Sequence, residues 1–405
     1  LLEEVTGLVE YPVALTGQFD ELFLEVPSQA LILAMKSHQK CFYLVNTNEE
    51  LLPYFVAVSN IRSNDPSQVI KGNERVIRPR LADAKFFYET DKQKTLEDRL
   101  DQLKKVVFQE KLGTVFDRSL RVANLAKFIA AQTGENEAQS ERAAMLSKCD
   151  LVTNMVGEFA DLQGLMGSYY AANDGEPEPV ITAICEQYLP KYAGDDLPST
   201  PLGSLLAIAD KLDSIVGLFA IGQPPTGSKD PFALRRSAIG ILRIMVENQL
   251  DLDLLACIEA SLSEFGSLES ESKTAEKVFD FMLERFRSWY SDEGIPSNVF
   301  QSVMEIKPRK PHDFAKRIQA VSSFEQLTES AALAAANKRV SNLLVKVDGA
   351  SLSTEVSEAL LIDDAEKILF QQLRDKELRT APLFNSGNYT SGLAELAELK
   401  DSVDG

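Results

Sequence analysis

Apolar residues recur every three or four positions through most of the chain, and this spacing is clearest over residues 200–246. It predicts a helix that begins at Pro201 with Thr200 as its N-cap. A second helix is expected to follow, with Asp230 as N-cap and Pro231 as its first residue. A short loop rich in proline and glycine joins these two helices.

The first part of the chain has a different pattern, in which short apolar runs alternate with turns. Residues 41–46 and 52–59 are predicted to form a β-hairpin, and residues 27–39 a helix. The remaining strand-like runs of residues 1–70 lack obvious partners, and the chain opens on Leu1. We therefore expect an α/β piece that has lost an upstream region.

From residue 73 onward helical spacing predominates. Residues 74–89 are expected to form a basic and aromatic helix that carries Phe86, Phe87 and Tyr88. Burial preferences place such a triplet in the core, and the alternative is stacking on nucleic-acid bases. Overall the pattern predicts a mainly α, multidomain protein with an N-terminal α/β piece.

In the next helical segments, the sequence predicts the role of several polar residues. Residues 96–107 are expected to form an amphipathic connector in which Asp101 pairs with Lys105. Asp117 is expected to cap the helix that comes next. A helix opening at Ser140 is expected to continue to residue 159, with Asp150 on its polar stripe.

Acidic residues also interrupt the apolar helix that follows Thr200. Asp210 and Asp213 lie one turn apart, and together with Asp150 they offer carboxylates for a hard cation or for acid and base chemistry. The alternative is a solvated or salt-bridged helix face. In that case Arg118 or Lys148 supplies the counter-charge.

Composition narrows the class of protein. The 405 residues are 44% hydrophobic and 25% charged, which is ordinary for a globular chain of about two to four domains. Apolar runs are broken before the ~18 residues that a membrane helix needs, and no signal peptide precedes the first elements. We expect a cytoplasmic protein without a membrane partner.

The formal net charge of −19 argues against binding to nucleic acid without regard to sequence, because phosphates are repelled at long range. Any such binding must rely on local basic patches. These patches are Lys71, Arg75, Arg78 and Arg80; Lys229, Arg235, Arg236 and Arg243; Lys307, Arg309, Lys310, Lys316 and Arg317; and Lys338 and Arg339.

Metal and nucleotide motifs are weak. Two histidines exclude a three-histidine metal site, and four widely spaced cysteines are most simply buried apolar residues. His38 and Cys41 can form half a metal site, but an exposed helix end is the preferred interpretation. Residues 222–229 resemble a phosphate loop only superficially, since the lysine and serine stand in the wrong order.

Three segments resemble HD-domain phosphohydrolases. They are RSLRVANLA from Arg118, AAMLSKCD ending at Asp150 and AIADKLD ending at Asp213. The resemblance places Arg118 where the family has its first histidine and Cys149 or Ser147 where it has the second, and leaves Asp150 and Asp210 as the surviving acidic positions. It implies a degenerate HD-like domain without catalytic residues or metal, and the alternative function is an HD-type metal-dependent phosphohydrolase.

A longer resemblance covers nearly the whole chain in consecutive order. The sequence is similar to the beta subunits of bacterial heterotetrameric glycyl-tRNA synthetases in QALILAMKSHQKCFYLVN, GNERVIRPRLADAKFFYETD, VVFQEKLGTVFDRSLRV, KCDLVTNMVGEFADLQGLMG, ADKLDSIVGLFAIGQPPTGSKDPFALRRSAIGILRI and AAANKRVSNLL. Because the family's chains are longer at both ends, the resemblance implies a fragment that lacks both.

The resemblance also implies a domain plan. Residues 1–70 correspond to an α/β module similar to B3/B4 domains, and residues 71–115 to a helical linker. Residues 116–300 correspond to the degenerate HD-like helical domain. Residues 301–405 correspond to the start of a helical anticodon-binding domain.

The function implied by the resemblance is recognition of tRNA(Gly) for ATP-dependent glycine attachment on a separate alpha subunit, in an alpha2beta2 assembly. ATP and Mg are expected at the alpha subunit, and this chain alone is expected to be inactive, with no catalytic residue. A purely structural or interaction protein is the remaining alternative. Candidate tRNA contacts are Lys229, Arg235, Arg236 and Arg243 for the acceptor arm, and Arg309, Lys310, Lys338 and Arg339 for the anticodon side.

Overall fold

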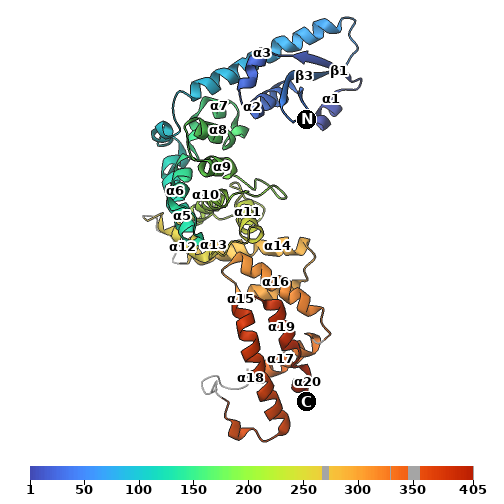
Figure 1. Ribbon diagram of the computed structural model, residues 1–405, viewed down its shortest axis with the longest axis vertical. Helices are drawn as coiled ribbons and strands as arrows, with labels where there is room; N and C mark the ends of the chain where they lie inside the picture. The colour runs from blue at the N-terminus through green and yellow to red at the C-terminus, as the bar shows by residue number, and fades with distance from the viewer. Residues whose placement is uncertain (267–272, 329, 345–355, 405) are drawn as a thin grey trace. The chain divides into compact units, whose positions relative to one another are not determined.

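The computed structural model describes residues 1–266, 273–328, 330–344 and 356–404 of the 405-residue chain. Contacts divide the chain into two units, Leu1–Pro224 with Ala260–Ser270, and Pro225–Glu259 with Glu271–Gly405 (Figure 1). Helices predominate in both. Within the described ranges, no helix is both long enough and apolar enough to cross a bilayer.

The first unit opens with a three-stranded antiparallel sheet in the order β1-β3-β2. Its strands are β1 (Val13–Gln18), β2 (Phe42–Val45) and β3 (Leu51–Ser59), and they are accompanied by α1 (Leu2–Leu8) and α2 (Ser28–Leu33). The predicted hairpin is confirmed as β2 and β3. The expectation of unpaired strands is wrong, because β1 pairs along its length with β3.

Helix α3 (Pro66–Asp91) packs against β1 (Figure 1), and Ile77, Leu81 and Ala84 are among its buried residues. It begins at the N-cap Asp65, earlier than expected, because the Asp65 carboxylate accepts the Ser67 N–H at 3.1 Å. The core expectation for the aromatic triplet is wrong at Phe86, which is 65% exposed. The residue faces away from the sheet-packing side of the helix.

A helical layer follows α3 in the first unit. Its elements are α4 (Leu100–Leu103), the two-stranded ribbon of β4 (Val107–Gln109) and β5 (Gly113–Thr114), α5 (Val115–Thr133), α6 (Glu137–Leu146), α7 (Asn154–Glu158), α8 (Leu165–Asn173), α9 (Glu178–Glu186) and α10 (Pro201–Ala220). Helix α10 packs against α5, α6 and α9 and is buried along most of its length. It is the central helix of this layer.

The predicted connector over residues 96–107 is not one continuous α-helix. It forms a 3-10 turn (Glu97–Arg99) and the short α4, and the ribbon of β4 and β5 follows. Since α4 ends at Leu103, Lys105 is not on its surface, and Asp101 pairs instead with Lys104 at 2.6 Å. The residue expected to cap the next helix, Asp117, is its third residue, in a capping box with the N-cap Thr114.

The single helix expected from Ser140 to residue 159 is wrong. Helix α6 starts at the N-cap Asn136, and a 3-10 turn (Cys149–Val152) separates it from α7. Thr153 takes an extended conformation, φ −88° and ψ 155°, and caps α7. The break turns Asp150 into the protein interior, so it lies on no solvated stripe.

The helix pair around residues 200–246 is partly confirmed. Thr200 caps α10 and accepts the Gly203 N–H at 3.1 Å. Helix α11 (Leu234–Glu247), however, begins three residues later than predicted, with Ala233 at φ 53° as N-cap. Asp230 still satisfies its first amides, because its carboxylate accepts the Leu234 and Arg235 N–H groups at 2.8 and 3.0 Å.

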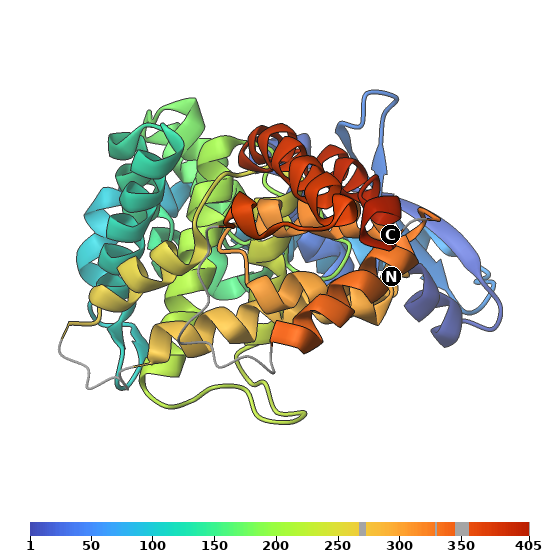
Figure 2. The same cartoon turned by 90° about the horizontal axis from the view of Figure 1, so that it is seen from below.

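The second unit is helical in its described residues. Besides α11 it contains α13 (Thr274–Leu283), α14 (Arg285–Asp292), α15 (Ser297–Ile306), α16 (Pro311–Glu325), the predicted alanine-rich α17 (Ser330–Leu344), α18 (Asp364–Asn385), α19 (Tyr389–Ala397) and α20 (Lys400–Asp404), while α12 (Leu254–Ser263) crosses the unit boundary. Stacked rings of Phe286 and Phe314, 4.6 Å apart, lie in its core. The red helices α18 and α19 lie side by side in both views (Figures 1 and 2).

Candidate functional site

The first candidate site is a buried charge network between α5 and α10. The Arg118 guanidinium donates to Asp210 Oδ1 at 2.9 Å and to Ser214 Oγ at 2.8 Å. Arg121 holds both oxygens of Asp213, at 2.7 and 3.2 Å. Every carboxylate that the sequence placed on this helix face is therefore paired with an arginine from α5.

The segment after α6 adds a second pair of charges. Lys148 Nζ lies 3.0 Å from Asp210 Oδ1 and donates to Gln187 Oε1 at 2.6 Å. The Asp150 carboxylate accepts the Gly164 and Gly167 N–H groups at 2.5 and 3.1 Å. The predicted counter-charges for Asp210, Arg118 and Lys148, are both confirmed.

Burial and pairing set the protonation states. Burial acts to raise the pKa of the Asp210 carboxyl, but the charges of Arg118 and Lys148 outweigh it and hold that pKa below its usual value. Burial lowers the pKa of Lys148 to about 8, although Asp210 acts against the shift. Asp210 is thus an ionised carboxylate between two cationic partners.

Asp150 makes stability depend on pH. Burial raises the pKa of its carboxyl from 3.8 to about 6, although the Gly164 N–H acts against the shift. The native state therefore holds this proton more tightly than the unfolded state. The resulting stability is fully present below pH 3.8 and is lost as pH rises through about 6.

We expect this loss to amount to at most about 3 kcal/mol of the free energy of unfolding. Urea unfolding on both sides of pH 6 measures it, with Asp150→Asn as the reference that lacks the titrating group. The difference between the two proteins should fall as pH rises from 3.8 to about 6 and be constant above that range. A difference that does not change with pH contradicts the assignment.

The network offers no place for a catalytic metal. Cys149, which stands at a histidine position of the HD pattern, is buried, and burial raises the pKa of its thiol to about 12. The guanidinium of Arg118 already occupies the side of Asp210 where a cation would bind. In the described part of the chain, no group of three or more histidine, cysteine, aspartate or glutamate side chains could hold a metal ion. The metal-dependent phosphohydrolase alternative has no support here.

The other cysteine motif also gives no site. Cys41 is buried, as expected for the cysteines, and does not belong to the exposed helix end preferred for the pair; burial raises the pKa of its thiol to about 11. The side chain of His38 lies outside the described residues. Cys149 and Cys257 are buried as expected, and Cys185 is partly exposed.

The second candidate site is the basic surface of the loop before α11. Thr226 and Lys229 exchange backbone hydrogen bonds at 3.1 and 2.8 Å, which closes a tight turn as expected and leaves the Lys229 side chain exposed. The Arg235 guanidinium donates to the Gly227 carbonyl at 2.7 Å and so ties the turn to the helix. The loop is held by its own contacts.

The two other arginines of this surface differ in availability. Arg236 is exposed and makes no ion pair with any described residue. Arg243 is largely covered, and its guanidinium binds both oxygens of Glu247, at 2.7 and 3.4 Å. A ligand would therefore meet a free cation at Arg236 and a neutralised one at Arg243.

The candidates on the anticodon side are dispersed. Lys310 Nζ pairs with Asp251 at 2.7 Å, and Arg309 lies 3.8 Å from Asp253. Lys338 is exposed on α17. Arg339 belongs to the same helix, but its side chain lies outside the described residues.

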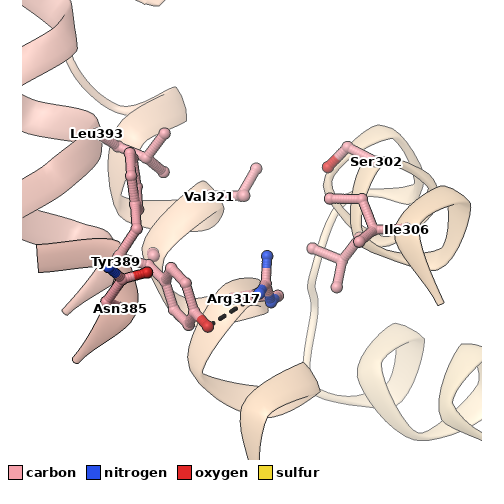
Figure 3. A pocket seen from close by; sticks show the side chains of 10 residues that line it. Ser302, Ile306, Arg317, Val321, Asn385, Tyr389 and Leu393 are labelled. Atoms are coloured by element: carbon pink, nitrogen blue, oxygen red, sulfur yellow. Dashed lines mark hydrogen bonds between the residues drawn. The ribbon is translucent and has the colours of Figure 1, made fainter. Parts of the chain in front are cut away.

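A hollow of about 510 Å³ lies between α15, α16, α18 and α19 of the second unit (Figure 3). Arg317 and Tyr389 form its polar part, with the guanidinium 4.3 Å from the ring centre and 2.9 Å from the phenol oxygen. Asp313 accepts from both side chains. Ile306 and Leu393 line the apolar part. Sequence reasoning grouped Arg317 with a basic patch, but no local signal joins it to a tyrosine in a distant helix.

Comparison with known proteins identifies the family to which this chain is similar. The family model described as glycyl-tRNA synthetase beta subunit matches residues 1–305. The glycine–tRNA ligase beta subunits of Marinobacter nauticus, Aliivibrio fischeri and Pseudoalteromonas translucida are 54%, 52% and 54% identical over 404 residues. Each match covers 100% of this chain and 58% of the relative. The chain thus spans less than two thirds of the length of these relatives.

Proposed function

Because the chain belongs to the glycyl-tRNA synthetase beta subunit family, we propose that it binds tRNA(Gly) and positions it for glycine attachment by a separate alpha subunit. The observation that carries the proposal is the 54% identity across the whole chain to a glycine–tRNA ligase beta subunit. In this proposal ATP and Mg²⁺ act on the alpha subunit. The present chain contributes binding, in an alpha2beta2 assembly in the cytoplasm.

The domain plan forms part of the proposal. Residues 1–70 serve as the B3/B4-like module, 71–115 as the linker, 116–300 as the degenerate HD-like domain and 301–405 as the start of the anticodon-binding domain. The ion pairs of Arg118 with Asp210 and of Lys148 with Asp210 support the degenerate assignment. They give the former metal positions a structural role, since they join α5, α10 and the segment after α6.

The basic surface before α11 is the proposed acceptor-arm contact. Its members are Lys229, Arg235, Arg236 and Arg243. Surrounding acidic residues repel phosphates, so binding concentrates where cations are exposed and unpaired. By this criterion Lys229 and Arg236 contribute most, since Arg235 and Arg243 are partly committed to neighbours.

The second unit carries the proposed anticodon-side contacts, Arg309, Lys310, Lys338 and Arg339. Arg309 and Lys310 sit in surface ion pairs, which exchange readily for phosphate because such pairs contribute little in water. The nearby hollow at Tyr389 presents an aromatic ring beside a guanidinium. Unpaired RNA bases are recognised by groups of this kind.

Arg236→Ala tests the proposal at an exposed arginine that has no ion pair with a described residue. We expect weaker retention of tRNA(Gly) in filter binding, and a slope of log affinity against log salt that is shallower by about 0.7–0.9. The reason is that one phosphate contact, with its released counterions, is lost. A tRNA of another specificity should be retained more weakly by the unaltered chain, with or without the alpha subunit.

Arg374→Ala is the matched control, because Arg374 is an exposed arginine of the same unit that lies 3.5 Å from Glu358. Its slope should equal that of the unaltered chain. An unchanged slope for Arg236→Ala removes that residue from the surface. Failure of the unaltered chain to retain tRNA(Gly) at any salt concentration, alone and with the alpha subunit, rejects the proposed function.

A further inference from the structure

One face of α3 carries three exposed cations that the family assignment does not explain. Lys71, Arg75 and Arg78 stand at positions i, i+4 and i+7 of this 26-residue helix and so form a single stripe. None of the three makes an ion pair or a hydrogen bond with a described residue. In a chain with a net charge of −19, unpaired cations on one line are a notable concentration of positive charge.

The stripe borders a hollow of about 660 Å³ at the end of β1. Two carboxylates also line it, and both are engaged with backbone amides. Glu74 accepts the Gln18 N–H at 3.0 Å, and Asp20 accepts the Leu22 N–H at 3.0 Å. Their hydrogen bonds hold them against the protein backbone. The cations of the stripe stay beyond ion-pair distance of both acids.

An aromatic side chain lies on the same side of the helix. Phe86 follows Arg75 by eleven residues, close to three full turns, and is 65% exposed. Because most of this ring is exposed, it is accessible to a ligand. Beside a line of cations, such a ring is suited to stack on a base.

The helix holds these groups in a fixed line. Its C-terminal residue Asp91 is buried and accepts the backbone N–H groups of Asn154 and Met155 at 3.0 and 2.9 Å. The Tyr170 hydroxyl donates to the same carboxylate at 3.1 Å. At the other end Asp65 caps the helix. The stripe is therefore carried by a capped helix whose C-terminal end is anchored to the rest of the first unit.

We propose that Lys71, Arg75 and Arg78 bind consecutive phosphates of an RNA strand, and that Phe86 stacks on a base of the same strand. Side chains at this helical spacing lie roughly 5–6 Å apart at Cβ, which suits neighbouring phosphates of one strand. The alternative ligand is an acidic protein surface. It would complement the positive charge of the stripe, but it would offer Phe86 no base on which to stack. The inference rests on the proposed function, since the RNA is the bound tRNA.

The test uses the full chain and fluorescently labelled tRNA(Gly), with affinity measured over a series of KCl concentrations. The variant Lys71→Gln/Arg75→Gln/Arg78→Gln is expected to bind more than tenfold more weakly in low salt, with a slope shallower by about 2–3. Phe86→Ala is expected to weaken binding by about fivefold or more at an unchanged slope, because stacking releases no counterions.

Arg80→Gln is the matched control on the same helix, since Arg80 lies half a turn away from the stripe and 4.0 Å from Glu158. Its slope should stay that of the unaltered chain. Thermal unfolding midpoints should agree among all variants, because the altered side chains are exposed. If the triple variant unfolds, the single variant Arg75→Gln replaces it in the test. Its slope is expected to be shallower by about 0.7–0.9.

The outcomes separate the two proposals. If the unaltered chain binds tRNA(Gly) and the triple variant keeps its slope, the stripe is not an RNA contact, while the proposed function stands. If the triple variant keeps tRNA binding but no longer binds the alpha subunit, the stripe is a protein interface and the inference is overturned. If the unaltered chain binds no tRNA, both proposals fall.

Discussion

Asp210→Asn is expected to lower the free energy of unfolding by about 3–5 kcal/mol, because it removes one charge from a buried network and leaves the cations behind. Asparagine keeps the shape of the side chain, so packing changes little. Asp210 Oδ1 is shared by Arg118 at 2.9 Å and Lys148 at 3.0 Å. Each cation then lies buried with an incomplete set of partners.

Urea unfolding at neutral pH measures this change, and a second substitution tests its cause. Lys148→Met removes one of the two cations, so Asp210→Asn should cost less in that background than in the unaltered chain. A coupling of at least about 1 kcal/mol is expected for groups in direct contact. Additive effects of the two substitutions would falsify the electrostatic explanation.

Asp101→Asn is the surface control for this prediction. Asp101 also pairs with a lysine, at 2.6 Å from Lys104, but both side chains are exposed. Water screens such a pair, and its removal should leave the unfolding curve where it was. An effect as large as that at Asp210 would show that lost charge alone, without burial, explains the destabilisation.

Gly203→Ala is expected to cost about 2–4 kcal/mol, from overpacking and lost buried hydrogen bonds. A Cβ at this position would lie 2.0 Å from Glu186 Oε2 and 2.8 Å from Thr200 Oγ1. Glu186 is buried and accepts from the hydroxyls of Ser199 and Thr200 at 2.6 and 2.7 Å. The carboxylate therefore cannot move aside without breaking the start of α10.

Gly157→Ala provides the matched control, because Gly157 is an exposed helical glycine with no atom within 4 Å of the added Cβ. Alanine there should be neutral or add about 0.5–1 kcal/mol. Thermal and urea unfolding of the two variants give the comparison. If the two variants are equally stable, the Glu186 carboxylate can move away from the added Cβ at little cost in free energy.

Local signals predicted the start of α10 well and that of α11 poorly. Thr200 and Pro201 suit an N-terminus whatever surrounds them, since the cap bond spans only three residues. At α11 the Asp230 carboxylate reaches Leu234 and Arg235 across an extra turn, with Ala233 in a left-handed conformation. Residue type alone does not distinguish these two ways of capping a helix.

In the candidate sites, too, the sequence predicted some side-chain contacts and missed others. The sequence predicts Arg118 or Lys148 as the counter-charge of Asp210, and the structure shows both within ion-pair distance. The partners of Asp150 were not predicted, since backbone amides of Gly164 and Gly167 leave no mark in the pattern of side chains. The pairing of Arg317 with Tyr389 likewise joins residues far apart in the chain.

The sequence by itself determined the helical class, the N-terminal hairpin, the family, and a histidine count too low for a three-histidine metal site. These follow from residue type and from spacing within one element. Only the tertiary structure decided that Glu247 neutralises Arg243, while Arg236, Lys71, Arg75 and Arg78 form no ion pair with any residue that the structure describes. The physical reason is that the availability of a charge depends on which opposite charges the fold brings within a few ångströms, and those come from distant segments.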